Sequence, residues 1–136
     1  AISLLPQLYR SLGRDDDERA ALAESLDRLQ RSLALNPDDP RALYKGAYVL
    51  AVFGQKERGL EWAERALAMD PTDAGTWYNV ACLYARVGDT DAALEKLARA
   101  IEHGFAHAEW VLNDGDFLEL RKDPRFTALL EGMTAQ

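Results

Sequence analysis

The chain has 136 residues, 48% of them hydrophobic, and a formal net charge of −7. This length suits one compact domain or one short repeat array, and so high an apolar content excludes a disordered chain. The negative charge argues against nucleic acid and against anionic membranes as partners of the domain as a whole.

Two helices are predicted before residue 38. The first spans Ser3 to Leu12, where leucines recur at helical spacing and Gly13 ends the run. The second runs from about Asp16 to Leu35, with leucines at three- and four-residue steps. The acidic residues 15–18 stand at its start, where the helix dipole favours negative charge by about 0.3–1 kcal/mol. We interpret residues 3–37 as a degenerate copy of the repeat that follows.

The next part of the chain overlays on itself when it is shifted by 34 residues, because residues 33–37 fall on residues 67–71. Beyond this segment, small residues meet small ones and large apolar residues meet large ones. The matched pairs are Leu43 with Trp77, Ala47 with Ala81, Leu50 with Tyr84, Gly54 with Gly88, Gly59 with Ala93, Ala66 with Ala100, and Leu67 with Ile101. Such a period predicts stacked helical repeats over residues 38–71 and 72–105.

Each of these repeats is predicted to contain two helices separated by a glycine. In the first, the helices cover residues 41–53 and a run through residues 60–67, which Asp70-Pro71 ends because proline cannot continue a helix. In the second, they cover residues 77–87 and 90–102. Asp73 and Asp89 are predicted to start helices, since aspartate is a favoured N-cap residue.

The C-terminal part departs from the repeat, with Gly104-Phe105 in place of Asp-Pro. A short helix through Trp110 and a final helix near Pro124 to Leu130 are predicted. A terminal repeat must cover an apolar face that is otherwise exposed, so residues 106–136 are expected to form a cap. Its covering side chains are predicted to be Trp110, Phe117, Leu120, Phe126 and Leu130.

A two-helix unit of this length resembles the tetratricopeptide repeat. The matched pairs from Leu43 with Trp77 to Ala66 with Ala100 carry the resemblance, together with Leu97 and Pro71. It implies an all-α fold in which antiparallel helix-turn-helix repeats stack as a short right-handed α-solenoid. Residues 1–136 would then form one domain, closed by a C-terminal capping helix.

The tail is also similar to the closing segment of repeat arrays at the C-terminus of bacterial signalling proteins. The residues concerned are Trp110, residues 114–118, 120–121 and 123–126, and Tyr78 to Cys82. In that group an adenylate or guanylate cyclase, a serine/threonine kinase or a DNA-binding regulator lies upstream. By this analogy, and because the chain starts at Ala1 without methionine, we expect a fragment of a longer protein.

The sequence offers no enzyme constellation, since it lacks a glycine-rich phosphate loop and a Gly-x-Ser-x-Gly elbow. Paired carboxylates such as Glu61 and Glu64 are typical of a solvated helix face. We therefore predict neither catalysis nor a cofactor. Residues 1–5 lead directly into Pro6 without a signal peptide, and no apolar run approaches a membrane span.

Two patterns invite a metal interpretation. His103 and His107 stand four apart, but Gly104 should break the helix that would align their rings. Asp114-Gly115-Asp116 resembles the opening of a calcium loop, without the further oxygen ligands and closing glutamate. We predict no metal site.

Three other residues are interpreted as structural. Cys82, the single cysteine, cannot form an internal disulfide, so a reducing cytoplasm is the simplest setting and a small buried residue its commonest role. Trp62 and Trp110 are predicted to pack in the interior rather than stack on a ligand.

The resemblance implies that the first helix of each pair lines a concave groove that holds a partner peptide or helix. The groove residues would be Arg41, Tyr44, Lys45, Tyr48, Tyr78, Asn79, Cys82 and Arg86. Because this set contains cations and tyrosines and no acid, we predict a partner with acidic or C-terminal carboxylate groups. Asn79 matches one asparagine of the carboxylate clamp of repeats that bind chaperone tails, but the other clamp positions are not reproduced.

Other interpretations of the same residues remain open. The groove side chains could be solvated or covered by the chain's own tail. The domain could instead be an architectural module that pairs upstream catalytic domains as a homodimer, with Leu4 and Leu8 as the contact. Small-molecule sensing between repeats is a third class, which no convergent set of polar residues supports.

Overall fold

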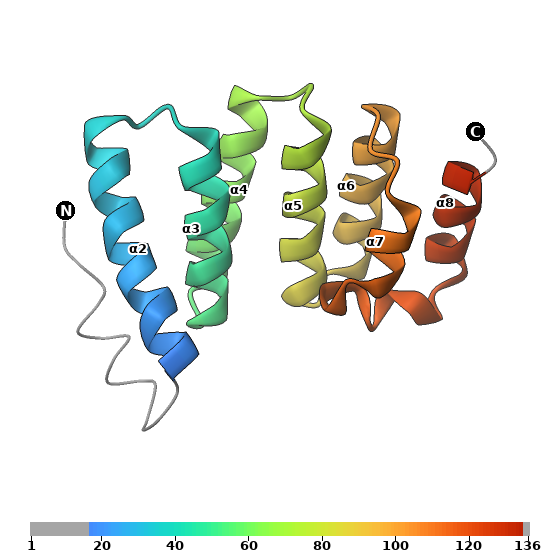
Figure 1. Cartoon of the computed structure of the whole chain (residues 1–136), viewed down its shortest axis with the longest axis horizontal. Helices are drawn as coiled ribbons and strands as arrows, with labels where there is room; N and C mark the ends of the chain where they lie inside the picture. Colours follow the sequence, from blue (N-terminus) through green and yellow to red (C-terminus); the bar gives the residue numbers. More distant parts are fainter. Residues whose placement is uncertain (1–16, 135–136) are drawn as a thin grey trace. The chain divides into compact units, whose positions relative to one another are not determined.

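A computed structural model describes residues 17–134, which form α-helices joined by turns and two short 3₁₀ helices (Figure 1). These residues contain no strand, so the predicted all-α fold of helix-turn-helix repeats is confirmed. The chain divides into two compact units, residues 1–69 and residues 70–136, called unit 1 and unit 2. The predicted helix over residues 3–12 and the contact through Leu4 and Leu8 lie outside the described residues.

Unit 1 contributes three helices that lie side by side, α2 (Asp17–Leu35), α3 (Pro40–Val52) and α4 (Lys56–Met69) (Figure 1). The start of α3 is capped by Asp39, whose carboxylate accepts hydrogen bonds from the backbone N–H groups of Arg41 and Ala42 at 3.1 and 3.3 Å. Two of the donors that a helix start leaves unpaired are thereby satisfied. The turn to α4 uses Gly54 at φ +83°, a conformation that only glycine adopts readily.

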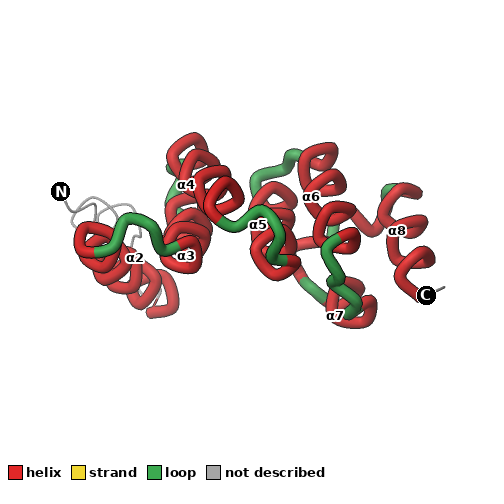
Figure 2. The backbone as a smooth tube through the Cα atoms, turned by 90° about the horizontal axis from the view of Figure 1, so that it is seen from above, coloured by secondary structure: helices red, strands yellow, loops and turns green. Residues whose placement is uncertain are grey.

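Unit 2 begins with an antiparallel pair, α5 (Ala74–Arg86) and α6 (Thr90–Glu102), seen from above in Figure 2. Asp73 caps α5 by accepting from the Thr76 N–H at 2.9 Å, and Asp89 caps α6 by accepting from the Ala92 N–H at 3.1 Å. Both predicted helix starts are confirmed. The α6 helix ends one residue before His103, and Gly104 takes φ +105°.

The end of unit 2 consists of α7 (Ala108–Asn113), the 3₁₀ helices η1 (Gly115–Phe117) and η2 (Leu120–Lys122), and α8 (Pro124–Thr134). Phe117, Leu120 and Phe126 are at most 1% exposed, as predicted for covering side chains. The prediction for Trp110 is wrong, because its side chain is 62% exposed. The two 3₁₀ helices follow no periodic pattern and were not predicted; they fold Phe117 and Leu120 inward.

The contact between α3 and α4 depends on two glycines, Gly46 and Gly59, which have no side chain. A Cβ atom added to Gly59 would lie 2.7 Å from the carbonyl oxygen of Ala47, so the two backbones approach as closely as they can. A Cβ atom on Gly46 would lie 2.4 Å from Cζ3 of Trp62, whose indole occupies that space and is 8% exposed. The prediction that Trp62 packs in the interior is therefore confirmed.

The equivalent positions of the second repeat carry a different pair, since Gly46 corresponds to Val80 and Trp62 to Lys96. In unit 2 the Lys96 ammonium lies 5.5 Å from the ring centroid of Trp77 and 5.7 Å from that of Tyr84. The helices of the two repeats thus agree in length to within one residue, with a glycine in each turn, but they pack differently. Of the helices within residues 17–134, none is both long enough and apolar enough to cross a membrane.

Candidate functional site

One acidic turn of unit 2 lies against the α5 face that the sequence assigned to partner binding. The Tyr78 hydroxyl donates a hydrogen bond to Oδ2 of Asp114 at 2.6 Å, and the Cys82 thiol lies 3.7 Å from the same oxygen. The other oxygen, Oδ1, accepts from the backbone N–H of Asp116 at 3.0 Å. One carboxylate therefore joins α5 to the turn that leads into η1.

Two arginines complete this contact. Nη1 of Arg86 lies 3.3 Å from Oδ1 of Asp116, and Nη2 of Arg121 donates to the Asp114 carbonyl at 3.2 Å. Three of the four predicted α5 residues thus contact the chain's own segment 114–116. The fourth, Asn79, is exposed and donates to the Gly75 carbonyl at 2.8 Å instead. In the sequence, Asp114 and Asp116 belong to the tail segment and to an incomplete calcium pattern, and no local signal pairs them with α5.

The electrostatics of this cluster keep its donors protonated. Burial, and then the hydrogen bond to Asp114, raises the pKa of Tyr78 well above its ordinary value, and burial followed by the charge of Asp114 raises the pKa of Cys82. Burial and the neighbouring Asp114 also raise the pKa of Asp116, against the opposing effect of Arg86. A protonated thiol is a weak nucleophile, so this Cys82 is suited to a hydrogen bond rather than to chemistry.

The same atoms are close enough together to suggest a metal site. Ligand atoms of Cys82, Asp114 and Asp116 lie within 4.8 Å of one another. However, each already has a partner within the protein, and the Arg86 guanidinium beside Asp116 repels a cation. The two histidines are arranged otherwise, since His103 stacks on Trp77 while His107 contacts Phe105 and Trp110.

The predicted residues of unit 1 lie together on α3. Arg41 and Lys45 are exposed, and Tyr44 and Tyr48 are half-buried. The Tyr44 hydroxyl makes no hydrogen bond within residues 20–133, unlike that of Tyr78 at the equivalent position. Within these residues, α3 therefore presents the same donor as α5, and no carboxylate accepts from it.

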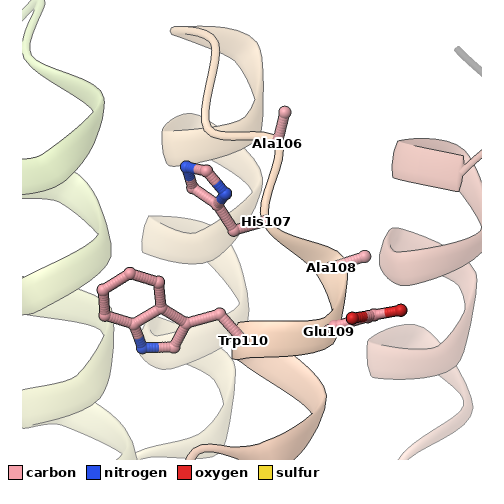
Figure 3. Close-up of a pocket in the computed structure, with 5 residues that line it drawn as sticks. All are labelled: Ala106, His107, Ala108, Glu109 and Trp110. Atoms are coloured by element: carbon pink, nitrogen blue, oxygen red, sulfur yellow. The ribbon is translucent and has the colours of Figure 1, made fainter.

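Exposed aromatic side chains stand beside the acidic turn. His107 and Trp110 project from one side of α7, whereas Glu109 projects from the other (Figure 3). The open cavity along residues 106–110 has a volume of about 430 Å³. Behind these rings Tyr78 stacks on Phe105, with centroids 4.3 Å apart and planes 10° from parallel. Sequence reasoning missed this surface because Trp110 was assigned to cover the apolar face at the end of the repeats.

The hydrogen bond between Tyr78 and Asp114 is expected to stabilise the folded state. Tyr78→Phe is expected to lower the free energy of unfolding at pH 7 by about 1 kcal/mol, because a hydrogen bond to a half-buried carboxylate is lost. In the wild type the raised pKa keeps the folded-state phenol neutral, while the unfolded-state phenol ionises near pH 10. Stability should therefore be lost as the pH rises above about 10, and Tyr78→Phe should lose less of it.

Urea unfolding at pH 7 and pH 10.5, followed by circular dichroism, measures both effects. Tyr44→Phe serves as the matched control, because its hydroxyl has no hydrogen-bond partner within the described residues. If the two variants lose the same stability at pH 7, the Tyr78 hydroxyl does not hold the acidic turn.

The comparison with protein families identifies part of the chain. The tetratricopeptide repeat matches residues 62–95, which comprise the second half of α4, all of α5 and the start of α6. A comparison with curated proteins found no match. Residues 62–95 are therefore similar to a tetratricopeptide repeat, within an all-α fold of that helical-repeat type.

Proposed function

We propose that this chain is a non-catalytic protein–protein interaction scaffold that binds a peptide or helix of a partner on the faces of its first helices. Tetratricopeptide repeats generally mediate protein–protein interaction and are typically not catalytic. The proposed partner segment carries acidic side chains or a C-terminal carboxylate.

The observation that carries this proposal is the intramolecular contact on α5. There a tyrosine and an arginine hold an acidic turn, with the Tyr78 hydroxyl 2.6 Å from Asp114 and Arg86 3.3 Å from Asp116. Tyr44 on α3 occupies the position in the first repeat that Tyr78 occupies in the second. Arg41 and Lys45 supply exposed cations beside it. We infer that α3 takes from a partner the kind of carboxylate that α5 takes from its own chain.

The wider setting is proposed from the sequence of the tail and from Cys82. The similarity of the tail to the closing segments of bacterial signalling proteins supports a role as the regulatory C-terminal part of a larger signalling protein. A cytoplasmic location suits the unpaired, buried Cys82, because thiols stay reduced there.

Peptides selected from a random C-terminal display library test the proposal. The selected peptides should be enriched in acidic residues, and Lys45→Glu should weaken their binding about 10-fold, because an attraction of about 0.5 to 1 kcal/mol becomes a repulsion of similar size. Lys56→Glu is the charge-matched control, since Lys56 is equally exposed but lies on α4. Equal weakening by both variants, or peptides without acidic enrichment, would contradict the proposal.

Self-association is the second candidate, as a module that pairs upstream domains. Three large apolar side chains of unit 2 are exposed, Trp110 by 62%, Leu112 by 49% and Leu118 by 58%. Exposed apolar groups of this size often belong to interaction surfaces. Sedimentation of the purified chain separates the two functions, because a strict monomer that binds the selected peptides excludes pairing through this surface.

A further inference from the structure

Unit 1 contains a cavity on a face that the α3 proposal does not use. It lies between the end of α2, the start of α3, and α4, and has a volume of about 210 Å³. Its lining is apolar at Leu33, Leu43 and Trp62 and cationic at Arg58 and Arg65, both from α4. We call it the Arg–Trp pocket.

Neither arginine of this pocket has an anionic partner among the side chains that the structure describes. No ion pair joins Arg58 or Arg65 to a carboxylate within residues 20–133. Arg58 lies over the Trp62 ring, 5.5 Å from its centroid. Glu61, which stands three residues after Arg58 and four before Arg65 on α4, is exposed and pairs with neither. In a chain of net charge −7, two unpaired guanidinium groups beside one cavity point to an anionic ligand.

The second repeat explains why Arg65 has no carboxylate partner on its own helix. Arg65 corresponds to Arg99, which pairs with Glu102 at 3.5 Å and lies 5.3 Å from the Trp77 ring centroid. The residue that corresponds to Glu102 in the first repeat is Ala68. The first repeat thus keeps the arginine and lacks its carboxylate.

The aromatic wall of the pocket is also peculiar to the first repeat. Trp62 lies against α3 because Gly46 has no side chain, and a Cβ atom there would be 2.4 Å from the ring. The second repeat has Val80 and Lys96 at these positions and so has neither the space nor the indole. The Trp62 indole therefore packs directly against the backbone of α3 at Gly46.

The chemistry and the size of the pocket define the ligand. Guanidinium groups bind carboxylates, and the indole and leucines bind an aliphatic group. A volume of about 210 Å³ is below the ~300–1,000 Å³ of pockets for whole small molecules or cofactors, but it accommodates one side chain. We infer that the Arg–Trp pocket binds an acidic segment of a partner protein, taking one aliphatic side chain while Arg58 and Arg65 pair with flanking carboxylates.

Fluorescence anisotropy of a labelled probe tests this inference on the full 136-residue chain. The probe is an acetylated, amidated peptide with one leucine between two pairs of glutamates. Arg58→Gln and Arg65→Gln should each weaken its binding about 5-fold, because each removes one partly exposed ion pair. Glu61→Gln should strengthen binding about 2-fold by removing a competing carboxylate. Arg28→Gln, at an exposed α2 position that does not line the pocket, should change nothing.

Two altered probes separate a pocket from general attraction of charge. Replacing the leucine with serine, or the glutamates with glutamine, should weaken binding at least 5-fold. The inference is overturned if the wild type does not bind the probe saturably, if the serine probe binds equally well, or if Arg28→Gln weakens binding as much as Arg65→Gln.

The same experiment distinguishes this inference from the proposed function. If Lys45→Glu abolishes probe binding and Arg65→Gln does not, the peptide binds the α3 face; this supports the proposed function and overturns the Arg–Trp pocket. If Arg65→Gln dissociates a dimer that the probe also dissociates, the occupant is a second copy of the chain, and the inference of a partner segment is wrong.

Discussion

Phe117→Ala is expected to lower the free energy of unfolding by about 3 to 5 kcal/mol, because it removes a large buried ring and leaves a cavity. Phe117 is 0% exposed, and its ring centroid lies 5.8 Å from the rings of both Tyr78 and Phe126. It therefore joins α5, η1 and α8 within unit 2. Without it, the acidic turn that precedes it should also lose its position against Tyr78.

Urea unfolding followed by circular dichroism measures this loss, with the linear dependence on urea giving the free energy. Leu118→Ala is the matched control, because Leu118 is the next residue and is 58% exposed. Its effect should stay within about 0.5 kcal/mol, as for most surface substitutions. Similar losses in the two variants would show that Phe117 is not the anchor of this end of the chain.

Gly46→Val is expected to destabilise the protein by about 2 to 3 kcal/mol, although valine is the better helix former. Relief of the glycine penalty in α3 contributes only a few tenths of a kcal/mol. Against it stands a clash, since any Cβ atom at this position meets Cζ3 and Cε3 of Trp62 at 2.4 and 2.7 Å. Overpacking of a helix contact costs about 1 to 3 kcal/mol, so the clash outweighs the propensity.

A control and a double variant make this prediction specific. Gly132→Val in α8 should change stability by no more than about 0.5 kcal/mol, because a Cβ atom there meets nothing within 4 Å. Adding Trp62→Lys to Gly46→Val reproduces the Val80 and Lys96 pair of the second repeat. The double variant should be at least 1 kcal/mol more stable than the sum of the single effects predicts. Strict additivity would mean that Gly46 and Trp62 do not depend on each other.

Local chemistry explains why most helices could be predicted. Residues 90–102 were predicted as a helix with the bounds that α6 has, and Asp73 and Asp89 cap helices as expected. The signals used were helical periodicity, an aspartate before the first turn and a glycine after the last turn. Each of them depends on contacts between residues no more than about four apart in the sequence. These signals recur after 34 residues, so the repeat could be predicted from the sequence.

The candidate sites were harder to predict for the opposite reason. The right-handed stacking of the repeats, the single domain over residues 1–136, and a groove shared by the α3 and α5 residues stay predictions. The acidic turn on α5 joins residues that are 36 apart in the sequence, Tyr78 and Asp114. No periodic pattern specifies such a pair, because it depends on how η1 turns back toward α5.

The sequence by itself determined the helices, their caps and turns, and the two-helix repeat, because these follow from contacts between near neighbours in the chain. Only the tertiary structure decided which of the predicted covering side chains stays exposed and which side chains contact one another. It left Trp110 in solvent, placed Trp62 against Gly46, and left Arg58 and Arg65 without a carboxylate partner within residues 20–133. The physical reason is that burial and pairing depend on residues far apart in the sequence, whose approach is set by packing between helices.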